Sequence, residues 1–472
     1  MASAGALRAR ASRVWAALPL RAVGSFAAGL LGLLLVAALF GSSSWSWVLW
    51  IGVGVVAGVI ARSGRLVWLA WLDVVAFYPL SLALGLTTHL GPFWFLGALI
   101  GAGLVSAGFA IGVPIRAGRD PRERIRSWWR ELGPGWRRLL ILLAVLGVVV
   151  LVGYALFAVV VGSETFVNPG TSANCLTPDR RFGWNYEAIN YDQRDDLNLA
   201  PALVPDKNGR LAWTCPSQGA IAGDEVVTSD GIHVAGWYIP AANGAGPAGP
   251  TLVLVHGKGS NKSEMLDYAV PLHDRFNLVL LDLRNGGRST RSISTAGIRE
   301  QRDVESVIDW LVRTKRPSWI AGLGNSMGAA TILAAARSDP RIEALILDSM
   351  HARIVVSTGN AIETEFGQPS LPGSWGVVIG ASLRAGADLT TVDPVRTITQ
   401  IGARPVLLTH GSADVVDPPD ESAEPNLAAA RRAGVPVELH YCPSAGHGKV
   451  IEVCSADWGR WATTFLEAAM AR

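Results

Sequence analysis

The sequence contains few charged residues for its length and little excess of either sign. Charged side chains make up 17% of the 472 residues, and the formal net charge is +3. This argues against a nucleic-acid partner, because proteins that bind the phosphate backbone carry dense clusters of lysine and arginine. The histidines lack close spacing with other histidines, cysteines or carboxylates, so the sequence implies no metal ion, and it implies no organic cofactor.

Cysteine is also scarce, and it is absent from the first third of the chain. The four cysteines are Cys175, Cys215, Cys442 and Cys454. An even number, confined to the later part of a chain, favours disulfides formed in an oxidising compartment. Three pairings are possible, and we expect the sequence neighbours to pair, Cys175 with Cys215 and Cys442 with Cys454. Buried free thiols are the alternative.

Long apolar runs are abundant, and they are concentrated before residue 162. Five segments there approach the ~20 residues that a helix needs to cross the hydrocarbon layer. They are Ala22–Phe40, Trp45–Ala61, Leu66–Thr87, Pro92–Val113 and Leu139–Val161. Lipid offers no partner to a free backbone amide, so we expect an all-α transmembrane region of about five helices over residues 1–161. The first segment could instead be a cleaved signal peptide, although four more segments follow it.

Arginines lie in alternate connections of this region. They precede the first segment, separate the second from the third, and fill the connection between the fourth and the fifth, while the other two connections contain neither lysine nor arginine. Basic connections stay in the cytoplasm. We therefore expect a multi-pass protein of the cytoplasmic membrane, with its N-terminus inside and everything after Val161 outside. Asp73, the one acid within a segment, is interpreted as a polar contact between helices rather than as a functional group.

After residue 162 the composition becomes that of a globular protein. Residues 162–224 hold two of the cysteines and carry no catalytic pattern, so we interpret them as a disulfide-held extracytoplasmic extension that packs on the sheet or shields the membrane side. Residues 225–472 begin with a predicted hairpin, Glu225–Pro240, that turns at Asp230-Gly231. A helix is predicted over Arg299–Val312 from its apolar spacing. Strands are predicted at Thr251–Val255, Asn277–Asp282, Ser318–Leu323, Ala344–Asp348, Arg404–Thr409 and Val435–Tyr441.

Strands that alternate with helices predict an α/β fold with a mostly parallel sheet and helices on both faces. Reactive groups in such folds gather at the carboxyl ends of the strands. The stretch GLGNSMGAA, Gly322–Ala330, lies at such an end and leads into an alanine-rich helix. Gly324 and Gly328 flank Ser326, because a sharp strand-to-helix turn leaves no room for side chains there. Small residues at a helix start are the alternative, but the strand–turn–helix context favours an exposed nucleophile.

A serine hydroxyl is a weak nucleophile until a base takes its proton, and that base must itself be oriented. Asp414 and His447 each follow a predicted strand, and the chain order Ser, Asp, His is the order that this architecture uses. We therefore predict that Ser326, Asp414 and His447 converge. The alternative acids are Asp348 and Asp417, and the alternative histidines are His351 and His410.

Residues 225–471 resemble the alpha/beta-hydrolase superfamily, nearest to its esterase and serine-aminopeptidase-like members. The resemblance is carried by LVLVHGKGSNK, LLDLRNGGRS, GNSMGAA, HGSADVVDPP and AGHG. It implies that Ser326 is the nucleophile, His447 the general base and Asp414 its orienting acid. It also implies that the backbone amides of Lys258 and Met327 form an oxyanion hole. The chain departs from the family at Asn285-Gly286-Gly287, where Gly-His-Gly is common, and in the short cap between its later strands.

The expected function is that of a membrane-anchored serine hydrolase, an esterase that acts outside the cytoplasmic membrane through an acyl-enzyme intermediate. Its expected partners are the lipid bilayer and a small acyl-ester or peptide substrate, with no nucleic acid. Peptidase or amidase activity, and acyl transfer to an envelope lipid, would use the same side chains. A non-catalytic receptor or scaffold on a hydrolase fold is the alternative outside enzymes.

Overall fold

The computed structural model describes residues 23, 25–34, 52–57, 60, 72–74, 76–77, 105, 129–130, 133–172, 174–197, 201–205, 211–214 and 223–472. The chain divides into two compact units. The first comprises Met1–Phe157 with Gly359–Ser374, and the second comprises Ala158–Thr358 with Trp375–Arg472. The second unit contains Ser326, Asp414 and His447.

The elements named below are those from residue 133 onward. The helices are α6 (Pro134–Phe157), π-helix η2 (Ala158–Gly162), α7 (Ser163–Val167), α8 (Pro178–Phe182), α9 (Gln193–Leu197), η3 (Lys262–Met265), α10 (Leu266–Ala269), α11 (Glu300–Thr314), α12 (Met327–Ser338), α13 (Ile354–Phe366), α14 (Ser370–Ala385), η4 (Leu389–Thr391), α15 (Pro394–Thr397), η5 (Ile398–Gln400), α16 (Ala423–Arg432), α17 (Val450–Val453) and α18 (Ser455–Met470). The strands are β1 (Glu187–Ile189), β2 (Ala202–Pro205), β3 (Leu211–Thr214), β4 (Gly236–Ile239), β5 (Thr251–Val255), β6 (Asn277–Leu281), β7 (Ile320–Asn325), β8 (Ala344–Asp348), β9 (Val406–Gly411) and β10 (Val437–Cys442).

Eight of these strands form one sheet, in the order β1-β4-β6-β5-β7-β8-β9-β10. The pairs from β6 through β10 are all parallel, whereas β4 is antiparallel to both β1 and β6. The predicted, mostly parallel sheet is confirmed, and the predicted strands Thr251–Val255 and Ala344–Asp348 have the observed bounds. The predicted helix Arg299–Val312 is α11.

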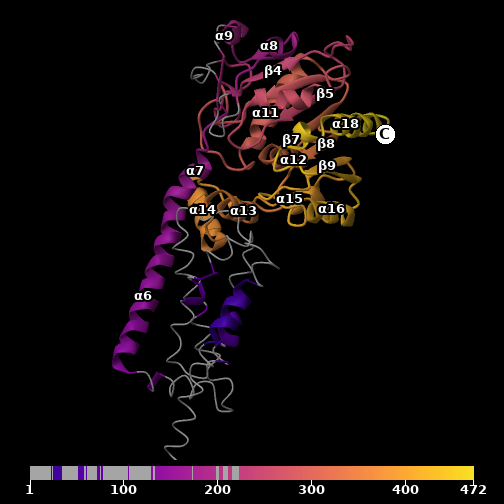
Figure 1. Cartoon of the computed structure of the whole chain (residues 1–472). Helices are drawn as coiled ribbons and strands as arrows, with labels where there is room; N and C mark the ends of the chain where they lie inside the picture. The colour runs from indigo at the N-terminus through magenta and orange to yellow at the C-terminus, as the bar shows by residue number, and fades with distance from the viewer. Residues whose placement is uncertain are drawn as a thin grey trace, which may run out of the picture. The chain divides into compact units, whose positions relative to one another are not determined.

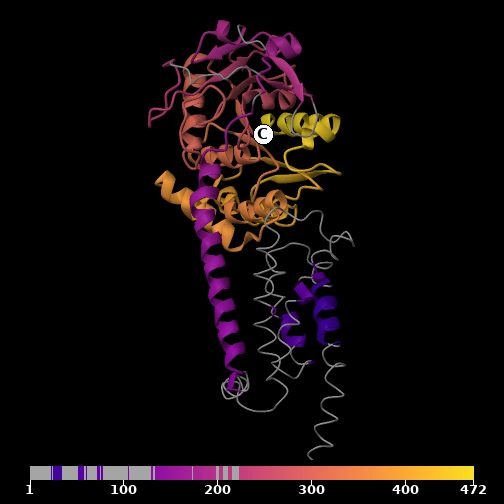
Figure 2. The ribbon, with the colours of Figure 1, turned by 60° about the vertical axis from the view of Figure 1, so that its left-hand side comes forward.

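The central strands are apolar on both faces, because helices cover both faces of a parallel sheet. Val253 and Val255 of β5 belong to one core, together with α11 and α12. Leu252 and Leu254 belong to the other core, together with α10 and α18. Helix α12 lies beside β7 and β8 (Figure 1), and α18, yellow next to the chain end, ends the chain (Figure 2). The two cores hold the carboxyl ends of the parallel strands at one edge of the sheet.

Part of residues 162–224 joins this sheet. Strand β1 pairs with β4, and Ile189 lies opposite Gly236. Asn190 follows β1 with a left-handed φ of 73°. Its side-chain amide donates to the carbonyl oxygens of Val226 and Val234 at 2.7 and 2.9 Å. The predicted hairpin is present only as a turn, closed by a single bridge between residues 227 and 233, and β4 is its one regular strand.

A buried ion pair holds the first two loops of the site edge together. The Lys262 ammonium donates to the Asp282 carboxylate at 2.5 Å, and the two side chains are 4% and 0% exposed. The backbone amides of Lys262 and Arg288 also donate to that carboxylate. Burial raises the pKa of Asp282, but Lys262 and these neighbours outweigh it and hold the pKa below its usual value. The carboxylate is therefore charged in the interior.

One long apolar helix precedes the globular part. The 24 residues Ala144–Val167 run through α6, η2 and α7, and nearly all of their most apolar stretch is exposed. Among the described residues this is the one helix long and apolar enough to cross a bilayer, and it overlaps the predicted segment Leu139–Val161. Ser25–Leu34 is a shorter apolar helix. Most of the four earlier predicted segments lies outside the described residues, so their number stays a prediction.

Replacing Lys262 by methionine should leave the Asp282 charge buried without its cation. Breaking a buried pair in this way costs about 3–5 kcal/mol, which corresponds to a fall of roughly 10 °C in Tm. The fall in Tm is measured by thermal unfolding of the full-length protein in detergent, monitored by near-ultraviolet circular dichroism. The matched control is Lys449→Met, which removes an exposed pair with Glu452 and should cost less than about 1 kcal/mol. Equal losses in the two variants would contradict the prediction.

Candidate active site

The turn between β7 and α12 exposes Ser326 by bringing three stretches of backbone unusually close. A Cβ added to Gly324 would lie 2.4 Å from the carbonyl oxygen of Gly328, and one added to Gly328 would lie 2.2 Å from that of Val255. Ser326 itself has a φ of 53° and a ψ of −119°. Its amide donates to the Asp348 carbonyl oxygen at 2.8 Å. Glycine is required at both flanking positions, and the serine is held in a strained conformation by its surroundings.

Ser326, His447 and Asp414 form a continuous chain of hydrogen bonds. The Oγ atom of Ser326 lies 2.8 Å from Nε2 of His447. The Nδ1 atom of His447 lies 2.8 Å from Oδ2 of Asp414. The other carboxylate oxygen of Asp414 accepts the amides of Val416 and Asp417 at 3.0 and 2.8 Å. The structure thus brings together the three side chains that the sequence singles out, from the ends of β7, β9 and β10.

Asp417 is a second acid beside the same histidine. One of its carboxylate oxygens lies 3.7 Å from Nδ1 of His447 and accepts a hydrogen bond from Ser357 at 3.2 Å. The longer distance leaves Asp414 as the direct partner of the imidazole. The alternative histidine, His410, has its Nε2 atom hydrogen-bonded to the carbonyl oxygen of Asp417 at 2.6 Å. This contact is expected for a residue packed inside the turn.

Asp348, the other alternative acid, lies beneath the turn rather than beside the histidine. Its fully buried carboxylate accepts hydrogen bonds from Tyr268 at 2.5 Å, Thr409 at 2.6 Å and Asn325 at 2.8 Å. Since its backbone carbonyl also holds the Ser326 amide, Asp348 supports the nucleophile from below. Sequence reasoning missed this role. No sequence pattern marks Tyr268 as a partner of Asp348. Asn325 could have been noticed, because it precedes Ser326 in the motif.

The two amides proposed for the oxyanion hole flank the serine. Met327 is the first residue of α12, so its amide lies at a helix N-terminus. The loop of Lys258 lies against the nucleophile, because a Cβ added to Gly257 would lie 3.4 Å from Cβ of Ser326. The Met327 amide and the loop of Lys258 thus lie next to the nucleophile, and the role of the two amides as an oxyanion hole stays a prediction.

The charges around His447 favour its protonated form. Burial lowers the pKa of His447, but the hydrogen bond and charge of Asp414, with the charges of Asp417 and Asp348, raise it above the usual value. Burial raises the pKa of Asp417 to about 6, against the opposing effect of His447. Burial and the neighbouring His447 lower the pKa of His351 to about 4, so this alternative histidine is neutral. Only His447 carries the contacts of a proton acceptor for Ser326.

Comparison with known proteins agrees with the fold. A family model for the alpha/beta hydrolase fold matches residues 250–376. The uncharacterized protein YfhR of Salmonella typhi is 30% identical over 254 residues, which are 51% of this chain and 76% of that protein. The chain belongs to the alpha/beta-hydrolase family. YfhR of Escherichia coli O157:H7 is 32% identical over 201 residues, which are 41% of this chain, and the chain spans 63% of that relative's length.

Solved structures are similar at lower identity. The esterase Pf2001 of Pyrococcus furiosus shares 18% identity at a TM-score of 0.47, covering 64% of this chain and 97% of the esterase. A hydrolase of Pseudomonas aeruginosa PA01 shares 24% identity at a TM-score of 0.38, covering 51% of this chain and 96% of that one.

A disulfide closes the loop that carries His447. Cys442 and Cys454 are bonded, with their Cα atoms 6.0 Å apart and a separation of 12 positions in sequence. His447 lies between them. Cys175 is also disulfide-bonded, and Cys215 lies outside the described residues. The pairing of Cys442 with Cys454 is therefore confirmed.

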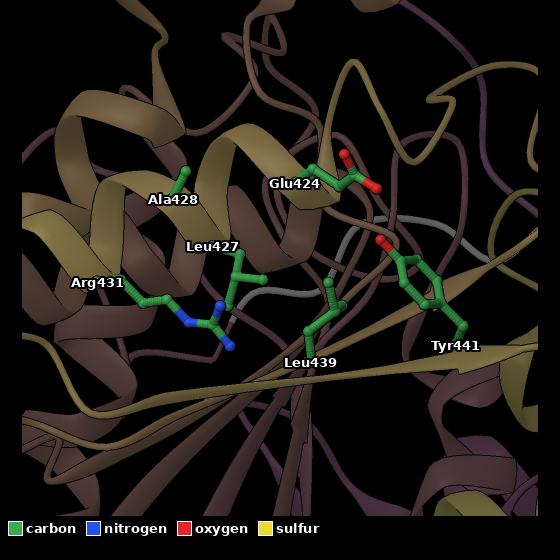
Figure 3. Close-up of a pocket in the computed structure, with 6 residues that line it drawn as sticks. All are labelled: Glu424, Leu427, Ala428, Arg431, Leu439 and Tyr441. Atoms are coloured by element: carbon green, nitrogen blue, oxygen red, sulfur yellow. The ribbon is translucent and has the colours of Figure 1, made fainter.

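A surface hollow lies away from the site, between α16 and β10 (Figure 3). The labelled side chains that line it are Glu424, Leu427, Ala428, Arg431, Leu439 and Tyr441. The Tyr441 ring points toward Glu424 across the hollow (Figure 3). None of its residues belongs to the hydrogen-bonded chain of Ser326, so the hollow is no part of this site.

Asp417→Asn should shift the rising limb of the pH profile of kcat/KM toward lower pH. Catalysis needs neutral His447, so activity rises with pH through its raised pKa. Removing a negative charge 3.7 Å from Nδ1 stabilises the imidazolium less and should lower that pKa by about one unit. Asp420→Asn, at an exposed acid three positions away, is the control and should leave the limb in place. If Asp417→Asn abolishes activity at every pH, then Asp417 rather than Asp414 orients the base.

The double variant Cys442→Ala, Cys454→Ala should lower kcat. The bond restrains a loop whose closure is worth roughly 3 kcal/mol in the chain-entropy model, and a looser His447 should cost up to about tenfold in rate. Steady-state kinetics with and without a reducing agent measure the effect. Reduction should bring the wild type to the level of the variant and leave the variant unchanged. Full activity in the fully reduced wild type would refute the role of this bond.

Proposed function

We propose that this protein is a membrane-anchored serine hydrolase that cleaves carboxylic esters outside the cytoplasmic membrane. The observation that carries the proposal is the hydrogen-bonded chain from Ser326 through His447 to Asp414 at the carboxyl edge of the sheet. The strained turn and the two flanking amides support the same reaction, because acyl transfer needs both a nucleophile and a site for negative charge.

The reaction follows from these contacts. Nε2 of His447 takes the proton of Ser326 as Oγ attacks the ester carbonyl carbon. The amides of Met327 and Lys258 donate to the carbonyl oxygen as it becomes an oxyanion. The tetrahedral centre then expels the alcohol, which takes the proton from His447, and leaves an acyl-serine. Water loses a proton to the same nitrogen, attacks the acyl-serine, and releases the acid while Ser326 regains its proton.

Three observations support the membrane anchor and its direction. The apolar helix Ala144–Val167 is long enough to cross a bilayer, and nearly all of its most apolar stretch is exposed. Arginines lie in alternate connections of the apolar region, which favours a cytoplasmic N-terminus. Disulfides in the globular part fit an oxidising compartment. Together they support a hydrolase domain on the outer side.

Labelling by a fluorophosphonate tests the nucleophile. Wild-type protein in native membranes should be labelled at Ser326, because the probe phosphonylates a serine activated by its histidine. Ser326→Ala should abolish labelling and lower the turnover of a nitrophenyl ester by at least about 10³-fold. Peptide mapping of the labelled protein gives the site. Absence of labelling in the folded wild type would favour a non-catalytic scaffold.

A further inference from the structure

Helix α14 presents a row of large apolar side chains to the outside. Trp375, Ile379 and Leu383 recur every four residues, which places them on one face of the helix. Their exposed fractions are 48%, 45% and 75%. Val378 and Ala381, on another face, are fully buried. A row of this kind marks a surface that an apolar partner covers.

The same helix is fixed to the end of the apolar helix Ala144–Val167. The Arg384 guanidinium donates to the carbonyl oxygen of Val160 and to Oγ of Ser163, each at 2.8 Å. It also forms an ion pair with Glu164 at 2.8 Å. In Figure 1, α14 lies just below α7, next to the upper end of the long helix. These bonds fix α14 at one level along the long helix.

Glycines allow α14 and the long helix to approach each other closely. A Cβ added to Gly380 would lie 2.2 Å from the carbonyl oxygen of Val159. A Cβ added to Gly162 would lie 2.7 Å from a methyl carbon of Val377. The two helices therefore meet backbone to backbone, which leaves little freedom for α14 to move along the long helix.

The sequence of the long helix indicates at which level of a bilayer α14 would lie. Its apolar run continues to Val161, and Ser163 and Glu164 are the first polar residues after it. A helix that crosses a bilayer leaves the hydrocarbon layer where its apolar run ends. The residues that bind Arg384 thus lie at the lipid headgroups, the level that tryptophan side chains favour. The row on α14 reaches this level too.

The next turn of the long helix contacts the candidate active site. The Lys258 ammonium lies 3.9 Å from the centre of the Phe166 ring. The Val167 carbonyl oxygen accepts the amide of Ser294 at 2.9 Å, and Oγ of Ser294 lies 3.7 Å from the sulfur of Met327. Val160 and Phe166 are six residues apart, or about 9 Å along a helix. The site therefore opens close to the level of the headgroups.

From these contacts we infer that α14 lies in the outer interface of the bilayer, and that the site takes esters carried by lipids of that leaflet. The lipid contact rests on the proposed membrane anchor, and the substrate class rests in addition on the proposed hydrolase function. Lipid is the occupant because Arg384, next to the row, binds Val160, and the exposed apolar side chains of Val160 and Val161 end the apolar run of the long helix. Of the charges beside the row, Arg384 and Glu164 pair with each other, and Asp388 accepts hydrogen bonds from the amide and the hydroxyl of Thr390.

Photocrosslinking tests the lipid contact without using activity. Benzoylphenylalanine is placed at Leu383 of the full-length protein, reconstituted in vesicles of phosphatidylcholine and phosphatidylglycerol. The control position is Val270, which is 46% exposed in the same unit. Mass spectrometry should find lipid adducts at position 383 at least about tenfold above position 270. Equal yields at the two positions, or adducts of position 383 with protein segments or a second copy in place of lipid, would overturn the inference.

Kinetics test the substrate class. The variant Trp375→Gln, Ile379→Gln, Leu383→Gln should raise KM for a long-chain glyceride ester in these vesicles by at least about tenfold. Its kcat/KM for a water-soluble butyrate ester should stay within about twofold of wild type, since the row does not touch the reacting atoms. Fluorophosphonate labelling of the variant verifies that the site is folded. The matched control is Val270→Gln, Val312→Gln, at two other exposed positions, which should change neither constant.

The outcomes separate the two proposals. Equal losses on both esters, or a wild type that cleaves only the soluble ester, would refute lipid esters as substrates and leave the hydrolase intact. A wild type inactive on every ester and unlabelled by fluorophosphonate would refute the proposed function, while the crosslinking result would still decide the lipid contact.

Discussion

The close approach of three backbone segments at the turn before α12 is the constraint on which the site depends. Gly328 lies against the carbonyl oxygen of Val255, and Gly324 lies against Gly328, so no side chain fits at either position. This packing forces Ser326 into its left-handed conformation and directs its oxygen away from the sheet. Parallel pairing of β5, β7 and β8 brings the segments together. Because the two apolar cores fix those strands, the strain at one residue is maintained by the stability of the whole domain.

Two carboxylates lie beside the imidazole of His447 and a third lies beneath Ser326, and the three have different tasks. Asp414 contacts the ring directly and has its second oxygen fixed by two backbone amides. Asp417 lies farther away, and because burial raises its pKa to about 6 it adds its charge only above that pH. Asp348 is occupied by three donors and acts as a support beneath the serine. The division follows from geometry, since an acid can orient the histidine only from within hydrogen-bond distance of Nδ1.

The sequence was sufficient to predict the central strands of the sheet and the residues that meet at their carboxyl ends. It was not sufficient to predict the outermost strand. Fully apolar runs such as Thr251–Val255 can only be buried strands here, and the glycine spacing at Ser326 has a steric cause that the sequence alone reveals. Strand β1 has three residues, and its pairing with β4 depends on a long-range fold that no local pattern encodes. The choice between Asp348, Asp414 and Asp417 also needed coordinates. All three end strands or follow them, and only side-chain direction tells the orienting acid from the supporting one.

The departure from the family pattern at Asn285 has a physical explanation in the join to the long helix. The Asn285 side chain donates to the carbonyl oxygen of Val167 at 3.2 Å, and the amide of Gly287 donates to Oγ of Thr171 at 3.0 Å. The Asn285 bond gives the Val167 carbonyl oxygen a second donor, beside the amide of Ser294 at 2.9 Å. The loop at Asn285 and the end of the long helix are therefore joined by direct hydrogen bonds. A helix that served only as a flexible connection would not need these contacts. The end of the helix thus helps to position the loops of the site, and its Phe166 ring packs against the Lys258 ammonium.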